Sequence, residues 1–182
     1  GGPGGYAAAF LAADLGLEVT LVDLEENPGG VCLYRGCIPS KALLHVSKLL
    51  TEARHAEAWG VKFTEPKIDI DKLRSWKDSV VAKMTGGLGQ LSKAKKVTFI
   101  QGRARFVNAQ SLEIDKVDGE TVQLSFEHAV LATGSRPATI PSLVPDSPRI
   151  LDSTTALDID DVPKSLLVVG GGYIGLELGS VY

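Results

Sequence analysis

The sequence lacks a hydrophobic run long enough to cross a bilayer, and it lacks the basic start and apolar centre of a signal peptide. It also lacks an excess of positive charge, because its net charge is −3. That charge argues against sequence-independent nucleic-acid binding, which needs a basic surface. Hydrophobic residues make up 44% of the 182 residues and charged residues 23%, which excludes disordered and fibrous proteins. We expect a globular protein with no membrane span and no nucleic-acid partner.

Cysteine is scarce, since Cys32 and Cys37 are the only two. They could be inert core thiols. They could also bind a metal with His45 or His55, but the further ligands that such a site needs are scattered, so we expect no metal. A third interpretation is a redox disulfide. The pair precedes residues 39–41, which suit the first turn of a helix, and a helix N-terminus with a nearby lysine lowers the pKa of a thiol. On these residues alone the core-thiol and redox interpretations both stay open.

Glycine is abundant, with 20 residues that cluster near the two ends and near position 85. At the C-terminal end, Gly170, Gly172 and Gly175 follow the apolar residues 166–169 in the pattern G-x-G-x-x-G, and Glu177 lies two residues further on. Between a strand and a helix, these glycines permit a tight turn and let the backbone approach a pyrophosphate. The helix N-terminus then supplies N–H groups for the phosphates. This motif predicts a dinucleotide site.

The N-terminal end carries a partial copy of this pattern. Gly2 and Gly5 fit its second and third glycines, and Asp23 falls about where an acid binds the ribose hydroxyls. One such motif can be a structural turn only, but two in one chain favour nucleotide binding. Because both ends fall inside an expected glycine turn, we expect the chain to be part of a longer protein.

The periodicity of the sequence indicates mixed helices and strands. Apolar spacing of three and four predicts helices at residues 6–15, 42–59 and 70–93. Asp118 and Gly119 mark a hairpin turn, and Gly16 suits the end of a helix. A connection rich in proline contains Pro137, Pro141, Pro145 and Pro148. Strands are predicted at residues 18–23, 97–100, 103–107, 111–114, 121–126, 129–132 and 165–169.

Residues 29–44, Gly-Gly-Val-Cys-Leu-Tyr-Arg-Gly-Cys-Ile-Pro-Ser-Lys-Ala-Leu-Leu, resemble the active-site segment of the flavin-dependent pyridine nucleotide–disulfide oxidoreductases. Within that family, the stretch from Gly36 onwards is most similar to the members that oxidise dihydrolipoamide. Residues 85–88, 102–106, 132–137 and 170–177 follow in the family's order, so the resemblance spans the whole chain. Two residues depart from the usual pattern. Tyr34 stands where the family usually has Asn, and Asp23 where Glu is more common.

The resemblance implies an α/β fold, with an FAD/NAD(P)-binding, Rossmann-like parallel sheet, helices, a β-meander insertion and the start of a second nucleotide-binding domain. Residues 1–150 would form the FAD-binding domain with the redox disulfide, without its first strand. Residues 151–164 would be a linker, and residues 165–182 would begin a truncated NAD-binding domain.

The resemblance also implies roles for individual residues. Cys32 and Cys37 would form the redox disulfide, with Cys32 exchanging with dihydrolipoamide and Cys37 lying against the flavin. Lys41 would be catalytic and would bind the flavin near its reactive nitrogen. Residues that would contact FAD are Gly2, Gly5, Asp23, Gly30, Ala104, Thr133 and Gly134, and those that would begin the NAD site are Gly170, Gly172, Gly175 and Glu177.

The implied activity is oxidation of dihydrolipoamide, carried on the lipoyl domains of 2-oxoacid dehydrogenase complexes, through the disulfide and FAD to NAD. The implied protein is a homodimer of the cytoplasm, or of the mitochondrial matrix in a eukaryote. The family's general base is a His held by a Glu in a C-terminal domain, so we expect no catalysis by His45, His55 or His128. Two alternatives remain: an NADPH-dependent reductase of the mercuric or glutathione type, and a non-catalytic FAD-binding fragment that is inactive alone.

Overall fold

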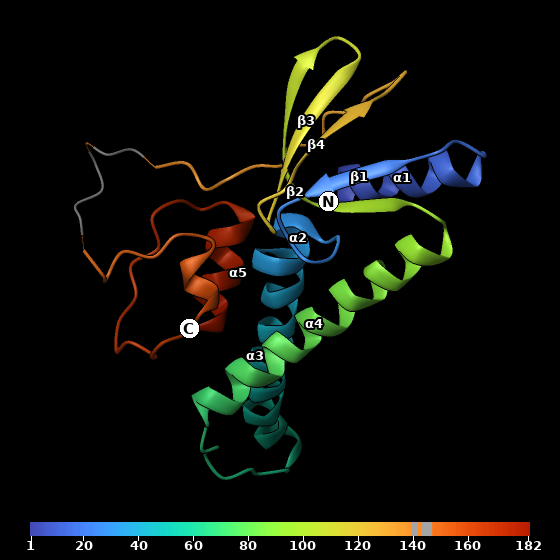
Figure 1. Ribbon diagram of the computed structural model, residues 1–182. Coiled ribbons are helices and arrows are strands. Elements are labelled where there is room, and N and C mark those ends of the chain that lie inside the picture. Colours follow the sequence, from blue (N-terminus) through green and yellow to red (C-terminus); the bar gives the residue numbers. More distant parts are fainter. Residues whose placement is uncertain (140–141, 143–146) are drawn as a thin grey trace. The chain divides into compact units, whose positions relative to one another are not determined.

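Helices fill most of the first half of the chain, and most of the sheet follows them, apart from one strand that lies between the first two helices (Figure 1). The structure is a computed structural model that describes residues 1–139, 142 and 147–182, so Pro141 and Pro145 of the predicted proline-rich connection lie outside the described residues. The helices are α1 (Pro3–Asp14), α2 (Gly30–Arg35), α3 (Cys37–His55), α4 (Ile70–Ala94) and α5 (Tyr173–Val181), with short 3-10 helices η1 (Ala56–Trp59) and η2 (Thr155–Leu157). The strands are β1 (Thr20–Asp23), β2 (Thr98–Asn108), β3 (Ser111–Lys116) and β4 (Thr121–Ser125).

The four strands form one sheet in the order β1-β2-β3-β4. The first part of β2 runs parallel to β1, and its second part pairs antiparallel with β3, which pairs antiparallel with β4. The two strands predicted at 97–100 and 103–107 are therefore one strand. Gly102 allows this continuity, because a Cβ atom there would lie 2.7 Å from the carbonyl oxygen of Asp115 on β3. The predicted β-meander and its turn at Asp118 and Gly119 are confirmed, with Gly119 at φ +90°.

All three predicted helices are present, and two begin earlier than predicted. Helix α1 begins at Pro3, since a proline in the first turn leaves no intrahelical hydrogen bond unmade. Helix α3 begins at Cys37 and includes Pro39 in its first turn for the same reason. Gly16 follows the end of α1 at φ +88°, as the sequence predicts.

Two of the predicted strands are wrong. Residues 129–132 and 165–169 are not strands, and within the described ranges no strand is hydrogen-bonded to either of them. An apolar run becomes a strand only where a neighbour satisfies its backbone N–H and C=O groups. Here the apolar side chains stay open to solvent, with Leu131 72% and Val169 91% exposed.

The chain forms two compact units, one of residues 1–34 and 83–135 and the other of residues 35–82 and 136–182. In the first unit, Ala9 and Phe10 of α1 pack on Leu21 of β1 and on Val97. In the second unit, Leu43 of α3 packs with Leu178 of α5 and with residues 156–159. The domain boundaries predicted from the sequence stay a prediction. No helix within the described ranges is long and apolar enough to span a membrane.

Candidate nucleotide-binding and redox site

The first glycine turn is packed backbone against backbone. Gly2 is the N-cap of α1, and its carbonyl accepts hydrogen bonds from the N–H groups of Gly5 and Tyr6, both at 2.9 Å. The N–H group of Gly29 donates to the carbonyl of Gly1 at 2.8 Å. Gly30 has φ +57°, and a Cβ atom there would lie 2.4 Å from the Cα atom of Gly2. No side chain fits at position 30 unless the turn moves.

Gly5 occupies the place of the third glycine of the motif, and it is buried between helix and sheet. A Cβ atom there would lie 3.5 Å from Leu21 of β1 and 3.5 Å from Ala132. A methyl group would fit at this distance, but a longer side chain would push α1 away from β1. The geometry therefore agrees with the role of a third glycine in close helix–strand packing.

Asp23 ends β1 beside this turn. One carboxylate oxygen lies 2.7 Å from the nitrogen of Gly1, and the other accepts a hydrogen bond from the N–H group of Glu25 at 2.9 Å. The Asp23 side chain is 24% exposed, and both of its carboxylate oxygens have a partner in this structure. The structure thus places Gly1, Gly2, Gly30 and Asp23 together.

The two cysteines lie at the junction of two helices. Cys32 is half-buried in α2, and Cys37 is exposed as the first residue of α3. The hydroxyl of Ser40 donates to the carbonyl of Cys37 at 3.1 Å within the first turn of α3. Cys37 therefore stands at the N-terminus of a 19-residue helix, where unpaired N–H groups favour negative charge.

The second glycine turn leads into α5. Gly170 has φ +107°, and Gly172 is the N-cap of α5. A Cβ atom at Gly175 would lie 2.6 Å from the carbonyl oxygen of Gly170 and 2.9 Å from the side chain of Val168. Gly170 and Gly175 thus meet steric requirements of this turn, whereas Gly172 has open space around it and the segment before the turn is not a strand.

The ion pair between Lys41 and Glu177 joins α3 to α5. The ammonium group of Lys41 lies 2.5 Å from a carboxylate oxygen of Glu177. The hydrogen bond to Glu177 raises the pKa of Lys41, against a smaller opposing effect of desolvation. The sequence singled out both residues but gave no sign of their pairing, because they are 136 positions apart.

The remaining predicted residues lie outside these two turns. Ala104 is an exposed residue of β2 opposite Ile114, and Thr133 and Gly134 lie in the segment after β4, with Gly134 at φ +76°. The histidines His45, His55 and His128 are exposed. Among the described residues, no group of three or more His, Cys, Asp or Glu side chains is arranged to hold a metal ion.

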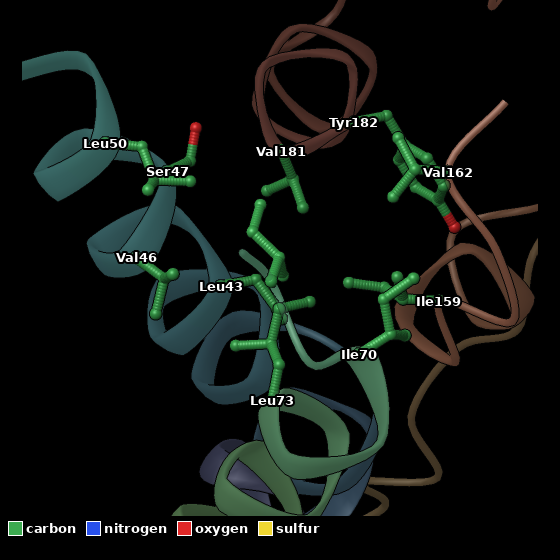
Figure 2. A pocket seen from close by; sticks show the side chains of 11 residues that line it. Leu43, Val46, Ser47, Leu50, Ile70, Leu73, Ile159, Val162, Val181 and Tyr182 are labelled. Atoms are coloured by element: carbon green, nitrogen blue, oxygen red, sulfur yellow. The ribbon is translucent and has the colours of Figure 1, made fainter. Parts of the chain in front are cut away.

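The second unit also contains an apolar cavity of about 60 Å³, between α3, α5 and the start of α4 (Figure 2). Ligand sites for small molecules are usually roughly 300–1,000 Å³. This cavity is too small for a dinucleotide, and we interpret it as imperfect packing. Its lining includes Leu43, Val46, Ile70, Leu73, Val181 and Tyr182.

A family model of the pyridine nucleotide-disulphide oxidoreductases matches residues 1–182, so the chain belongs to this family. The resemblance seen in residues 29–44 is thereby confirmed. Similar curated proteins are dihydrolipoyl dehydrogenases: that of Haemophilus influenzae is 51% identical, that of Geobacillus stearothermophilus 50%, and the mitochondrial dihydrolipoyl dehydrogenase 2 of Arabidopsis thaliana 43%. Each similarity covers 100% of this chain, but the chain spans only 36–38% of the length of these relatives.

A solved structure supports the fold. The match to the crystal structure of LpdA from Mycobacterium tuberculosis covers 90% of this chain and 36% of the LpdA chain, with a TM-score of 0.79 and 28% sequence identity. The predicted α/β class is confirmed by this similarity and by the mixed sheet with its helices.

Proposed function

We propose that the full-length protein containing this chain is a flavin-dependent disulfide oxidoreductase that oxidises dihydrolipoamide to lipoamide. Electrons would pass through a Cys32–Cys37 disulfide and FAD to NAD. The observation that carries the proposal is the cysteine segment, residues 29–44, in a chain that is 51% identical to a dihydrolipoyl dehydrogenase along its whole length.

Membership of the family and the named relatives imply FAD and NAD(H) as cofactors. FAD accepts two electrons from thiols and passes them to a nicotinamide. The first glycine turn would bind the pyrophosphate through the N–H groups at the start of α1, and Gly2 and Gly30 let its backbone segments pack closely. Asp23 would bind the ribose hydroxyls, while Gly5, Ala104, Thr133 and Gly134 would complete this site. Gly170, Gly172, Gly175 and Glu177 would begin the NAD site.

The cysteine chemistry follows from thiol–disulfide exchange. A thiolate of dihydrolipoamide attacks the sulfur of Cys32, which breaks the Cys32–Cys37 bond and releases Cys37 as a thiolate. The second substrate thiolate then attacks the mixed disulfide and displaces Cys32. Lipoamide leaves as the cyclic disulfide, and the enzyme keeps two electrons on its reduced cysteine pair, to be passed on to NAD.

Lys41 would lie near the reactive nitrogen of the flavin and favour negative charge on the reduced ring. In the structure the ammonium group of Lys41 pairs instead with the carboxylate of Glu177, which raises the pKa of Lys41. We assign the general base to none of the three exposed histidines.

The proposal includes the setting of the protein. Its partners would be lipoyl domains of a 2-oxoacid dehydrogenase complex, and it would act as a homodimer. Its place would be the cytoplasm, or the mitochondrial matrix in a eukaryote.

The test is the reduction of NAD by dihydrolipoamide with the full-length protein. We expect Cys32→Ser and Cys37→Ser to reduce the rate to background, because neither variant can form the disulfide. His45→Ala is the control, since the exposed His45 side chain has no assigned role, and it should keep the wild-type rate. A Cys32→Ser variant that reduces NAD as fast as the wild type contradicts the proposal.

Two results would favour the alternatives. Preference for NADPH as electron donor, with little activity on dihydrolipoamide, would indicate a reductase of the mercuric or glutathione type. Bound flavin without any turnover of either substrate would indicate a non-catalytic FAD-binding protein.

A further inference from the structure

The hydroxyl group of Tyr34 binds both backbone polar groups of Asn27. It accepts a hydrogen bond from the Asn27 N–H group at 3.3 Å and donates one to the Asn27 carbonyl at 3.1 Å. Tyr34 belongs to α2, and Asn27 lies in the loop of residues 24–29 that follows β1. A single side chain therefore ties this loop, which has no regular backbone pairing, to the helix that carries Cys32.

The same loop is fitted against α4. A Cβ atom at Gly89 of α4 would lie 2.0 Å from the side-chain oxygen of Asn27, so the Asn27 amide fits there only because residue 89 is glycine. A Cβ atom at Gly29 would lie 3.0 Å from both the buried Thr85 and the ring of Tyr34. The loop is thus held between Tyr34 on one side and α4 on the other.

The end of this loop packs against the first glycine turn. The N–H group of Gly29 donates to Gly1, and Gly30 is in close contact with Gly2. Any shift of residues 27–30 would consequently move the backbone against which the turn is packed. Tyr34 is well placed to prevent that shift, because it lies only four residues after Gly30 in a short helix.

We propose that Tyr34 is a positioning residue for the cofactor site. Its hydroxyl fixes the loop of residues 24–30 against Gly1 and Gly2, and it thereby keeps the pyrophosphate-binding turn in a fixed relation to Cys32. The inference rests on the proposed function, and it assigns a role to the residue that departs from the family's usual Asn.

The experiment uses the full-length protein and the substitution Tyr34→Phe, which keeps the ring and removes both hydrogen bonds. We expect hydrogen–deuterium exchange of the amides of residues 24–30 to become about tenfold faster, given the usual net contribution of such hydrogen bonds. Dissociation of FAD, followed by the fluorescence of the released flavin, should accelerate by a similar factor. The KM for NAD should not change.

Matched controls separate positioning from a general loss of stability. Tyr182→Phe also removes a tyrosine hydrogen bond, to the carbonyl of Ala156 at 2.9 Å, but in the other compact unit. It should leave both readouts unchanged. Gly89→Ala should imitate Tyr34→Phe by displacing Asn27, although alanine favours a helix. Gly87→Ala in the same helix, where a Cβ atom meets nothing within 4 Å, should have no such effect.

Unchanged exchange in Tyr34→Phe would overturn the inference. Faster exchange with unchanged FAD dissociation would also overturn it, because the loop would then not control the cofactor site. If the wild-type protein binds no FAD, or does not oxidise dihydrolipoamide, the proposed function fails instead. The exchange measurement would still show in that case whether Tyr34 holds the loop.

Discussion

At the residue scale, neighbouring glycines of the second turn differ in the space around them. A Cβ atom at Gly171 would meet no heavy atom within 4 Å, whereas one at Gly175 would lie 2.6 Å from a backbone oxygen. A backbone atom cannot rotate away as the end of a side chain can. Position 175 therefore requires glycine for steric reasons, and position 171 does not.

This contrast gives a prediction for the substitution Gly175→Ala in the full-length protein. The methyl group should force α5 away from Gly170, and overpacking of this kind costs about 1–3 kcal/mol. We expect the KM for NAD to rise by about tenfold, with bound FAD retained because the first turn is untouched. Steady-state kinetics with Gly171→Ala as the control measures the effect. Equal KM values for the two variants would contradict the prediction.

The sequence predicts chemistry-bearing residues but not their contacts. The spacing of Gly170, Gly172 and Gly175 predicts a turn, because local geometry depends on neighbouring residues. The Lys41–Glu177 pair and the fit of Asn27 over Gly89 depend on how distant helices pack, and no local pattern encodes them. One weak indication of the contact at Gly89 is present in the sequence. A glycine inside a helix costs about 1 kcal/mol relative to alanine, so its presence suggests that close packing excludes a side chain there.

At the element scale, helices were predicted better than strands. A helix satisfies its backbone N–H and C=O groups within one segment of the chain. Residues 70–93 were therefore recognised as a helix with an error of one residue at the end of α4. A strand depends on a partner elsewhere in the chain, and this is why residues 129–132 and 165–169 were predicted wrongly. The early start of α1 was missed because Gly2 and Gly5 were assigned to a glycine turn, and α3 begins two residues before the first turn predicted at residues 39–41.

The short helix η2 depends on one side chain that precedes it. The carboxylate of Asp152 accepts hydrogen bonds from the N–H groups of Thr154 and Thr155 at 2.8 and 2.9 Å. Both bonds lower the pKa of Asp152 below its usual value, and the bond from Thr155 has the larger effect. The helix in turn carries Ala156 and Leu157 into the core of the second unit.

We predict that Asp152→Ala lowers the free energy of unfolding by about 1 kcal/mol at pH 7, because the N–H groups of Thr154 and Thr155 lose their hydrogen-bond acceptor. A carboxyl group whose pKa is lowered on folding stabilises the protein above its unfolded pKa of about 3.9. That contribution is lost as the pH falls through the lower, folded value. Urea unfolding of both proteins at several pH values should show a difference that shrinks below pH ~4. A difference independent of pH would contradict this account.

At the scale of the whole molecule, the family could be recognised from sixteen residues, 29–44, because redox chemistry constrains that segment so strongly. The grouping of the chain into two units could not be foreseen, since each unit joins segments far apart in the sequence. The whole chain matches the family, but it spans only 38% of a relative such as the Haemophilus influenzae enzyme. We therefore assign the proposed electron transfer, from the substrate through the cysteine pair to the flavin, to the full-length protein.

The most direct test is to mix the oxidised full-length protein with dihydrolipoamide in the absence of oxygen and of NAD, and to follow the flavin absorbance. We predict an immediate change of the flavin bands in the wild type and in His45→Ala. The variants Cys32→Ser and Cys37→Ser should keep the spectrum of the oxidised flavin, because electrons can reach it only through the disulfide. An equally fast spectral change in either cysteine variant would contradict the account.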